Sequence, residues 1–246
     1  MFDHRYCVFF SLLFVAGCGS SESDSAGGSA LDSVGDSGEV AGATWTLSTL
    51  TTLYTDGAIA EGVQVCVYES ANCATVDGDG VAVLSDLPMD ENVWVSWTAA
   101  DAEDDLFPNV TGFHSSDGDM SWEQTLIRAS IRDLLFTLMG KSYDSGTGMI
   151  GFSVSREGVT AALEPTAGDG PYYVAGGLPS TTATETDETG NAFWLDVPPG
   201  EYDLSYTALD GKASCAAEVG TATGTGAASR VFMLAGFQTT ASGLCN

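Results

Sequence analysis

Short apolar segments separated by Gly, Asp, Asn and Pro run through the chain from Trp45 onward. Val63, Val65 and Val67 alternate with the residues between them, which is the period-two pattern of a strand with one buried face. Six further segments are predicted as strands, at residues 81–84, 93–97, 150–154, 192–195, 202–206 and 230–234. Many short strands joined by Gly and Asp turns indicate an antiparallel sandwich or barrel.

An internal repeat divides this β-rich region. Residues 77–88 (DGDGVAVLSDLP) align without gaps with residues 187–198 (DETGNAFWLDVP). The leading Asp of each segment is suited to accept backbone N–H bonds in a turn, and Gly80 or Gly190 supplies the positive φ at its end. A strand follows, and a proline ends it because proline cannot donate to the ladder. The repeat predicts two similar β modules, at residues 44–118 and 141–246.

One helix is predicted between the modules, within residues 119–140. Ser121 and Gln124 have the spacing of a capping box, S-x-x-Q. Leucine and isoleucine then recur at spacings of three and four, which predicts one apolar face. The residues of this face are Ile127, Ile131, Leu134, Leu135 and Leu138. Gly140 is suited to end the helix. We expect the helix to pack on the sandwiches as a bridge, with a partner-binding face as the alternative.

The repeat resembles a known family in both copies. The first copy has Gly-Val at 62–63 and Leu-Pro at 87–88, and the second has TDETG at 186–190 and VPPGEY at 197–202. These motifs resemble the carboxypeptidase regulatory-like domain, over residues 44–113 and 145–246. The resemblance implies transthyretin-like (prealbumin-like) β-sandwiches of about seven strands. It also implies an accessory rather than catalytic role, as in bacterial envelope lipoproteins. Met89-Asp90 stands where the family has Pro-Gly, which leaves the strand order of the first module open.

Residues 7–16 (CVFFSLLFVA) form an apolar run with a single serine. At ~1.5 Å per residue the run spans ~15 Å, half of a ~30 Å hydrocarbon core. It therefore predicts a signal peptide over 1–17 and not a membrane-spanning helix. Residues 15–18 (VAGC) resemble the lipobox of bacterial lipoproteins, which implies that the Cys18 thiol takes a diacylglycerol and the new amino terminus a further chain such as palmitate. The alternative is an ordinary secretory signal with a chance cysteine.

Residues 18–43 are predicted to be the lipid anchor followed by a disordered, flexible tether. Behind Cys18 the segment is rich in Gly and Ser, and it carries acidic side chains but no basic ones. Gly19 stands where some lipoproteins carry the aspartate of inner-membrane retention. The expected location is the bacterial cell envelope, at the outer membrane, with the lipid bilayer as partner through acylated Cys18.

Four cysteines follow the predicted leader and anchor: Cys66, Cys73, Cys215 and Cys245. An even number in an exported protein predicts two disulfides, and four cysteines allow three connectivities. We favour Cys66–Cys73 and Cys215–Cys245, because each pair falls inside one predicted module. The spacing lacks the C-x-x-C pattern of a metal site.

A formal charge of −27, from 34 acidic and 7 basic side chains, excludes nucleic acid and anionic lipid surfaces, because both require clustered Lys and Arg. Most carboxylates must therefore be solvated or hold cations. The densest acidic loop is a candidate for a weak Ca²⁺ site, and no other cofactor is expected. Its residues are Asp101, Glu103, Asp104 and Asp105. Residues 77–80 (DGDG) begin like a calcium loop but lack its later ligands, so we interpret them first as a turn.

His114 is the one histidine of the predicted mature chain, and a hydrolytic centre would need it as base. No G-x-S-x-G motif accompanies it, so no catalytic residue is assigned. Trp94 and Trp97 lie three apart on a predicted strand and must point to opposite faces, which leaves one available for stacking on sugar.

The sequence thus predicts a non-enzymatic envelope lipoprotein with structural or ligand-binding modules. The expected ligand is an envelope polysaccharide or another envelope protein, with the binding residues unassigned. The alternatives are a Ca²⁺-assisted carbohydrate-binding or adhesion module and a hydrolase around His114.

Overall fold

The computed structural model describes residues 42–101 and 105–246, so the predicted signal peptide, Cys18 and nearly all of the tether lie outside the described residues. The strands before the helix are β1 (Thr44–Leu53), β2 (Gln64–Val67), β3 (Cys73–Thr75), β4 (Val81–Pro88), β5 (Asn92–Thr98), β6 (Asn109–His114) and β7 (Met120–Leu126). The helix is α1 (Ala129–Leu138). The later strands are β8 (Gly148–Val154), β9 (Val159–Glu164), β10 (Asp169–Ala175), β11 (Leu178–Ser180), β12 (Asn191–Val197), β13 (Gly200–Ala208), β14 (Cys215–Ala217), β15 (Ser229–Met233) and β16 (Gln238–Cys245). The predicted mainly-β fold is confirmed, and each predicted strand segment overlaps an observed strand.

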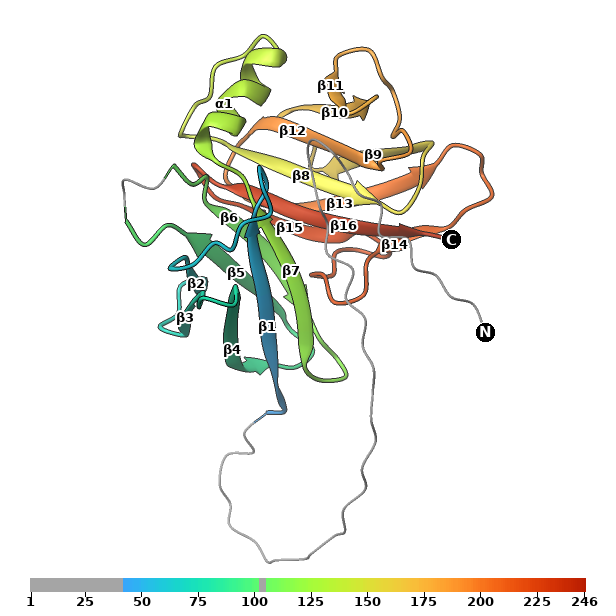
Figure 1. Cartoon of the computed structure of the whole chain (residues 1–246). Helices are drawn as coiled ribbons and strands as arrows, with labels where there is room; N and C mark the ends of the chain where they lie inside the picture. The colour runs from blue at the N-terminus through green and yellow to red at the C-terminus, as the bar shows by residue number, and fades with distance from the viewer. Residues whose placement is uncertain (1–41, 102–104) are drawn as a thin grey trace, which may run out of the picture.

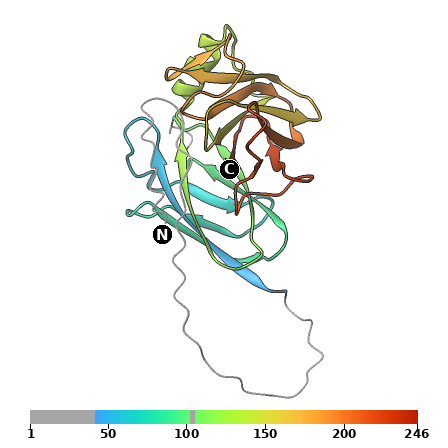
Figure 2. The ribbon, with the colours of Figure 1, turned by 90° about the vertical axis from the view of Figure 1, so that its right-hand side faces the viewer.

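Three sheets build the molecule, as Figure 1 shows. Two sheets have three strands each, in the orders β4-β1-β7 and β15-β13-β9. The third is a long mixed sheet in the order β11-β10-β12-β8-β16-β6-β5-β2-β3, with β14 paired to β16. Each small sheet covers one half of the long sheet, so that one sandwich lies below the other in Figures 1 and 2.

Alternation along the strands buries one apolar core in each sandwich. In the first sandwich, Leu47 of β1 and Trp97 of β5 share a core cluster and are both 0% exposed. In the second, Phe152 of β8 and Leu204 of β13 lie in the corresponding cluster. Removing these side chains from water supplies the main driving force for closing each sandwich.

The last strand, β16, joins the two sandwiches into one sheet. Its residues 238–240 pair in parallel with residues 109–111 of β6 on one side and with residues 149–151 of β8 on the other. Further along, residues 241–243 remain paired with β8, and residues 243–245 pair antiparallel with β14. The modules are therefore connected by a hydrogen-bonded strand as well as by the chain around the helix.

The helix α1 covers the opposite face of the long sheet. On β12, Ala192 and Trp194 belong to the second sandwich core, whereas Phe193 packs in a separate cluster with Leu135 and Phe136 of the helix. Successive strand residues point to opposite faces, so the helix packs on the back of this sheet. Its predicted apolar stripe is only partly buried, because Leu134 is 51% and Leu138 49% exposed.

The predicted capping box is wrong. Ser121 and Gln124 lie on β7, and the helix begins only at Ala129 without a side-chain hydrogen bond at its N-cap. This segment forms a strand and not the start of the helix, because residues 122, 124 and 126 point inward and residues 120–126 pair in parallel with β1. The inward Gln124 has buried partners, since its Oε1 accepts hydrogen bonds from the Thr111 hydroxyl at 3.2 Å and the Trp122 indole at 3.3 Å.

The internal repeat is visible in the backbone. Asp77 and Asp187 each open a turn in which the amide of Gly80 or Gly190 donates to the carbonyl of the leading Asp. Both glycines have positive φ, of 86° and 68°, as the turn requires. At the ends of the two segments, the aligned residues Asp86 and Asp196 both have positive φ as well, of 59° and 54°. The two copies therefore share a local backbone path.

Both predicted disulfides are present. Cys66–Cys73 joins directly paired residues of β2 and β3, at one edge of the long sheet. Cys215–Cys245 joins directly paired residues of β14 and β16. The first disulfide therefore closes the β2–β3 hairpin, and the second joins the C-terminal strand β16 to β14.

Candidate functional site

An open groove lies at one end of the second sandwich, with a volume of about 710 Å³. Turns contribute most of its wall, and the end of β10 contributes the rest. The lining residues are Arg156, Glu157, Gly158, Val174, Ala175, Glu185, Thr186, Asp187, Leu209 and Asp210. The TDETG segment of the repeat thus supplies part of the groove.

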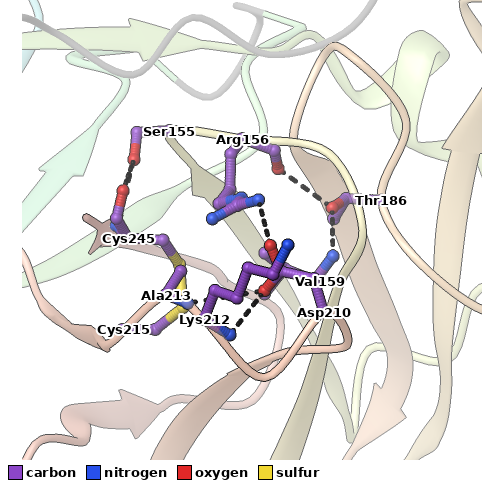
Figure 3. A network of polar contacts seen from close by, with 9 residues as sticks. All are labelled: Ser155, Arg156, Val159, Thr186, Asp210, Lys212, Ala213, Cys215 and Cys245. Carbon is purple, nitrogen blue, oxygen red and sulfur yellow. Dashed lines mark hydrogen bonds and ion pairs between the residues drawn. A yellow bond between two sulfur atoms is a disulfide. The ribbon is translucent and has the colours of Figure 1, made fainter.

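Thr186 is the residue that ties the turns together (Figure 3). Its buried hydroxyl donates to the carbonyl of Arg156 at 3.1 Å and accepts from the amide of Val159 at 3.0 Å. Its backbone pairs with the same segment, because the Thr186 amide donates to Val159 and the Thr186 carbonyl accepts from Gly158. The Leu209 amide donates to the Gly158 carbonyl at 2.9 Å, so three separate turns form one frame.

An ion pair stands at the groove wall. Nη2 of Arg156 lies 3.0 Å from Oδ2 of Asp210 (Figure 3). The amides of Lys212 and Ala213 donate to Oδ1 of the same carboxylate. These two hydrogen bonds, with the nearby guanidinium, hold the pKa of Asp210 below its usual range. The positive charge of Arg156 in the groove is therefore balanced by the ionised carboxylate of Asp210.

The frame continues to the C-terminal disulfide. The amide of Cys245 donates to the Ser155 hydroxyl at 3.0 Å, next to Arg156 in the chain (Figure 3). Cys245 is in turn bonded to Cys215, two residues after Ala213. One connected set of contacts therefore runs from the groove to the end of β16.

The other carboxylates of the groove differ in what they contact. The Asp187 carboxylate accepts from the amides of Gly176 and Thr189, both at 2.9 Å. Thr186 supplies the hydroxyl group of the lining, and that hydroxyl is bonded within the frame described above. Glu157 and Glu185 are exposed and hold no ion pair or hydrogen bond to other described residues.

His114, the candidate base of the hydrolase alternative, is the last residue of β6. Its Nδ1 is buried and has no hydrogen-bond partner among the described residues. A triad base bonds both a nucleophile and an orienting acid, so the described residues give no support to the hydrolase alternative at His114. The backbone of His114 instead has a structural contact, because its amide donates to the carbonyl of Gly220 at 3.0 Å.

The acidic loop is only partly described. Asp101 and Asp105 belong to the described residues, whereas Glu103 and Asp104 lie outside them. The Asp105 carbonyl accepts the amide of Ala129, which attaches the loop to the start of the helix. No group of three or more His, Cys, Asp or Glu within 42–101 and 105–246 is arranged to hold a metal ion. The weak Ca²⁺ site stays a prediction.

The second acidic candidate is a turn. Oδ1 of Asp77 accepts the amides of Asp79 at 3.0 Å and Val81 at 2.9 Å. Asp187 has the same contact in the second copy, from the amide of Thr189. These bonds satisfy the carboxylates locally, in agreement with the turn interpretation.

The tryptophans do not form an open sugar-binding platform. Trp97 is buried in the first core, and Trp94 points to the other face as predicted. There its ring lies 5.5 Å from that of Phe232 on β15, and Tyr68 packs against the same Phe232 at 5.1 Å. This aromatic junction, Tyr68, Trp94 and Phe232, joins the two sandwiches.

Lys141 forms a second charged cluster, just beyond the helix. Its ammonium group contacts the carboxylate of Asp169 and lies 3.1 Å from that of Asp196. Hydrogen bonds to these two carboxylates raise the pKa of Lys141. The amine is thus held protonated, and its role is to attach the end of the helix to β10 and β12.

The chain has distant likenesses among solved structures. No protein-family model and no curated protein matches the chain. The TIE protein of Bacillus anthracis is 13% identical with a TM-score of 0.29, covering 82% of this chain and 34% of its own. GBS52, the minor pilin of Streptococcus agalactiae, is 15% identical with a TM-score of 0.24, covering 82% and 95%. BcpA, the major pilin subunit of Bacillus cereus, is 10% identical with a TM-score of 0.31, covering 82% and 99%.

The chain therefore spans about a third of the Bacillus anthracis protein. At these TM-scores the likenesses carry no argument about function. In the described part of the chain, no helix has the length and apolar character needed to cross a membrane.

Proposed function

We propose that this chain is a non-enzymatic lipoprotein of the bacterial cell envelope, which presents two carboxypeptidase regulatory-like β-sandwiches as one stiff unit on a flexible tether. The observation that supports a single stiff unit is the pairing of β16 with both β6 and β8. Such a fixed arrangement suits a protein that positions a surface.

The stiffness follows from what would be lost if the sandwiches separated. Residues 238–240 would give up the β6 side of their pairing, and the buried Gln238 and Thr239 would be exposed. Nearby, the Asn92 amide group donates to the Thr223 carbonyl at 2.9 Å and accepts from the Thr223 amide at 3.0 Å. Together with the aromatic junction, these contacts oppose hinge motion, because unpaired buried backbone groups are costly.

The anchor is the part that connects this unit to the envelope. The lipobox-like sequence before Cys18 and the following Gly- and Ser-rich segment support a diacylglycerol anchor with a spacer behind it. Gly19 supports sorting to the outer membrane. The partner presented with this geometry would be an envelope polysaccharide or another envelope protein.

Metabolic labelling with a palmitate analogue tests the proposal. Wild-type protein should incorporate the label and fractionate with the outer membrane, and Cys18→Ala should lose both properties. Cys7→Ala is the matched control, because it removes a cysteine from the leader without changing the lipobox, and it should keep the label. Retention of label in Cys18→Ala would overturn the anchor, as would loss of label in both variants to the same degree.

A further inference from the structure

We propose that the groove of the second sandwich binds a basic peptide segment. A Lys or Arg side chain would lay its aliphatic stem on Leu209 and place its charged end on the carboxylates of Glu157 and Glu185. This inference goes beyond the envelope function proposed above and does not depend on the lipid anchor.

Charge complementarity selects a cation. Four carboxylates line the groove against one guanidinium. Arg156 is already paired with Asp210, and the Asp187 carboxylate accepts two backbone amides. Glu157 and Glu185 are therefore the groups left to meet a ligand, and both are acidic. A net charge of −27 over the whole chain attracts cations toward this surface and repels polyanions.

An apolar wall beside the carboxylates selects an alkyl-stemmed cation over a metal ion. Leu209 is 56% exposed although it belongs to the groove wall. Ala175, at the end of β10, adds a second exposed apolar side chain to the lining. Lys and Arg side chains bury their methylene stems on such surfaces while the charged end stays among polar groups. A bare divalent ion gains nothing from Leu209.

The groove is held in shape before any ligand binds. Thr186 fixes the segment 156–159, and the Leu209 amide is bonded to Gly158. The acidic residues Glu157 and Glu185 are each adjacent in the chain to a residue of this frame. A preorganised site loses little conformational entropy on binding, which favours a measurable affinity from few contacts.

The test uses the full-length protein and a fluorescent tri-lysine peptide, with its Nε-acetylated form as the uncharged probe. Fluorescence anisotropy at physiological ionic strength measures the dissociation constant. Wild-type protein should bind tri-lysine at least about tenfold more tightly than the acetylated peptide. Glu157→Gln/Glu185→Gln should weaken tri-lysine binding by about three- to tenfold, as expected for losing two exposed ion pairs.

Two further variants separate a specific site from general acidity. Glu91→Gln/Glu123→Gln makes the same charge change at exposed positions of the first sandwich and should leave the affinity unchanged. Leu209→Ser keeps every charge and should weaken binding by about threefold. All substituted positions are exposed, and thermal melts check that each variant folds.

Equal weakening by the two glutamine pairs would overturn the proposal, because binding would then reflect overall charge. The proposal would also be overturned if Leu209→Ser bound tri-lysine as tightly as wild type and spermidine displaced the peptide equally from both proteins. Binding would then be explained by charge alone, with no contribution from the apolar wall. Failure of tri-lysine to bind the wild-type protein would reject the groove as a basic-peptide site. None of these results bears on labelling of Cys18.

Discussion

Adding one methyl group at Gly112 would test how the two sandwiches meet. Gly112 lies on β6, paired with Trp94 of β5, which is one of the three residues of the aromatic junction. A Cβ at this position would stand 2.5 Å from the Cβ of Ala222 and 2.7 Å from Cε3 of Trp94, and it would crowd the rest of the indole ring. Ordinary contacts of this kind are 3.5–4.0 Å, so either the ring or the 220–223 segment must move.

The expected cost of Gly112→Ala is about 1–3 kcal/mol, the usual range for overpacking a filled interior. For a chain with about 200 folded residues, each kcal/mol lowers the melting temperature by about 2–4 °C. We therefore expect the melting temperature to fall by about 2–12 °C in differential scanning calorimetry. Gly78→Ala is the matched control, because its nearest neighbour would be Oε1 of Glu61 at 4.0 Å. That variant should change stability by less than about 1 kcal/mol.

A double-mutant cycle identifies the cause. Trp94→Leu removes the ring that the new methyl group would strike, so Gly112→Ala should cost clearly less in that background. Additive effects of the two substitutions would refute the packing described here. So would an unchanged melting temperature in Gly112→Ala, because the junction would then have room that the structure does not show.

Three further predictions concern charge, disulfides and calcium. Burial raises the pKa of Glu218, so this carboxyl contributes stability below pH ~4.5 that is lost as pH rises through its folded-state pKa. Glu218→Gln should therefore raise the melting temperature relative to wild type more at pH 7 than at pH 4, and an equal change at both pH values would contradict the assignment. Replacing Cys215 and Cys245 by Ser should lower the free energy of unfolding, measured in urea, by ~4 kcal/mol, and replacing Cys66 and Cys73 should lower it by ~2.5 kcal/mol. The first pair costs more because its cysteines are 30 residues apart in the sequence and those of the second pair are 7 apart. The reverse order would contradict this explanation by loop entropy. If the loop 101–105 binds Ca²⁺, millimolar Ca²⁺ should raise the melting temperature of wild type but not of Asp101→Asn/Asp104→Asn/Asp105→Asn, and no shift in wild type would rule the site out.

The strands that follow a simple apolar alternation could be predicted from the sequence. Val93, Val95 and Trp97 are all buried on β5, as their spacing requires. On β1, by contrast, the inward positions include Thr49 and Thr51, both 0% exposed. Gln124 takes an inward position on β7 in the same way. Polar residues at buried positions interrupt the apolar–polar alternation of the sequence. For this reason the hydrophobic pattern does not predict β1 and β7.

The shared sheet could not be predicted from local patterns. β16 (QTTASGLC) carries small and polar residues on both faces, because it is enclosed between neighbours and small side chains fit there. A Cβ on Gly243 would already come within 2.9 Å of the Tyr206 ring. Its pairing with residues 109–111 joins segments about half the chain apart, and no spacing rule reports such a contact.

Some residues of the groove can be identified from the sequence pattern. The repeat identified Thr186 and Asp187 as turn residues, and their partner Arg156 is one of only 7 basic residues in the chain. Their convergence with Leu209 and Asp210 depends on how β9, β12 and β13 are stacked, which the sequence pattern did not contain.

Hydrogen–deuterium exchange of β16 tests whether the two sandwiches form one unit. The amides of residues 239–243 belong to a strand paired with β8 throughout and with β6 at its start. We expect them to exchange only through global unfolding, with the same free energy of opening as the amides of Val110 and Thr111 on β6. If β16 exchanges through a lower-energy opening while β6 stays protected, the two sandwiches are separate units and do not form one stiff body.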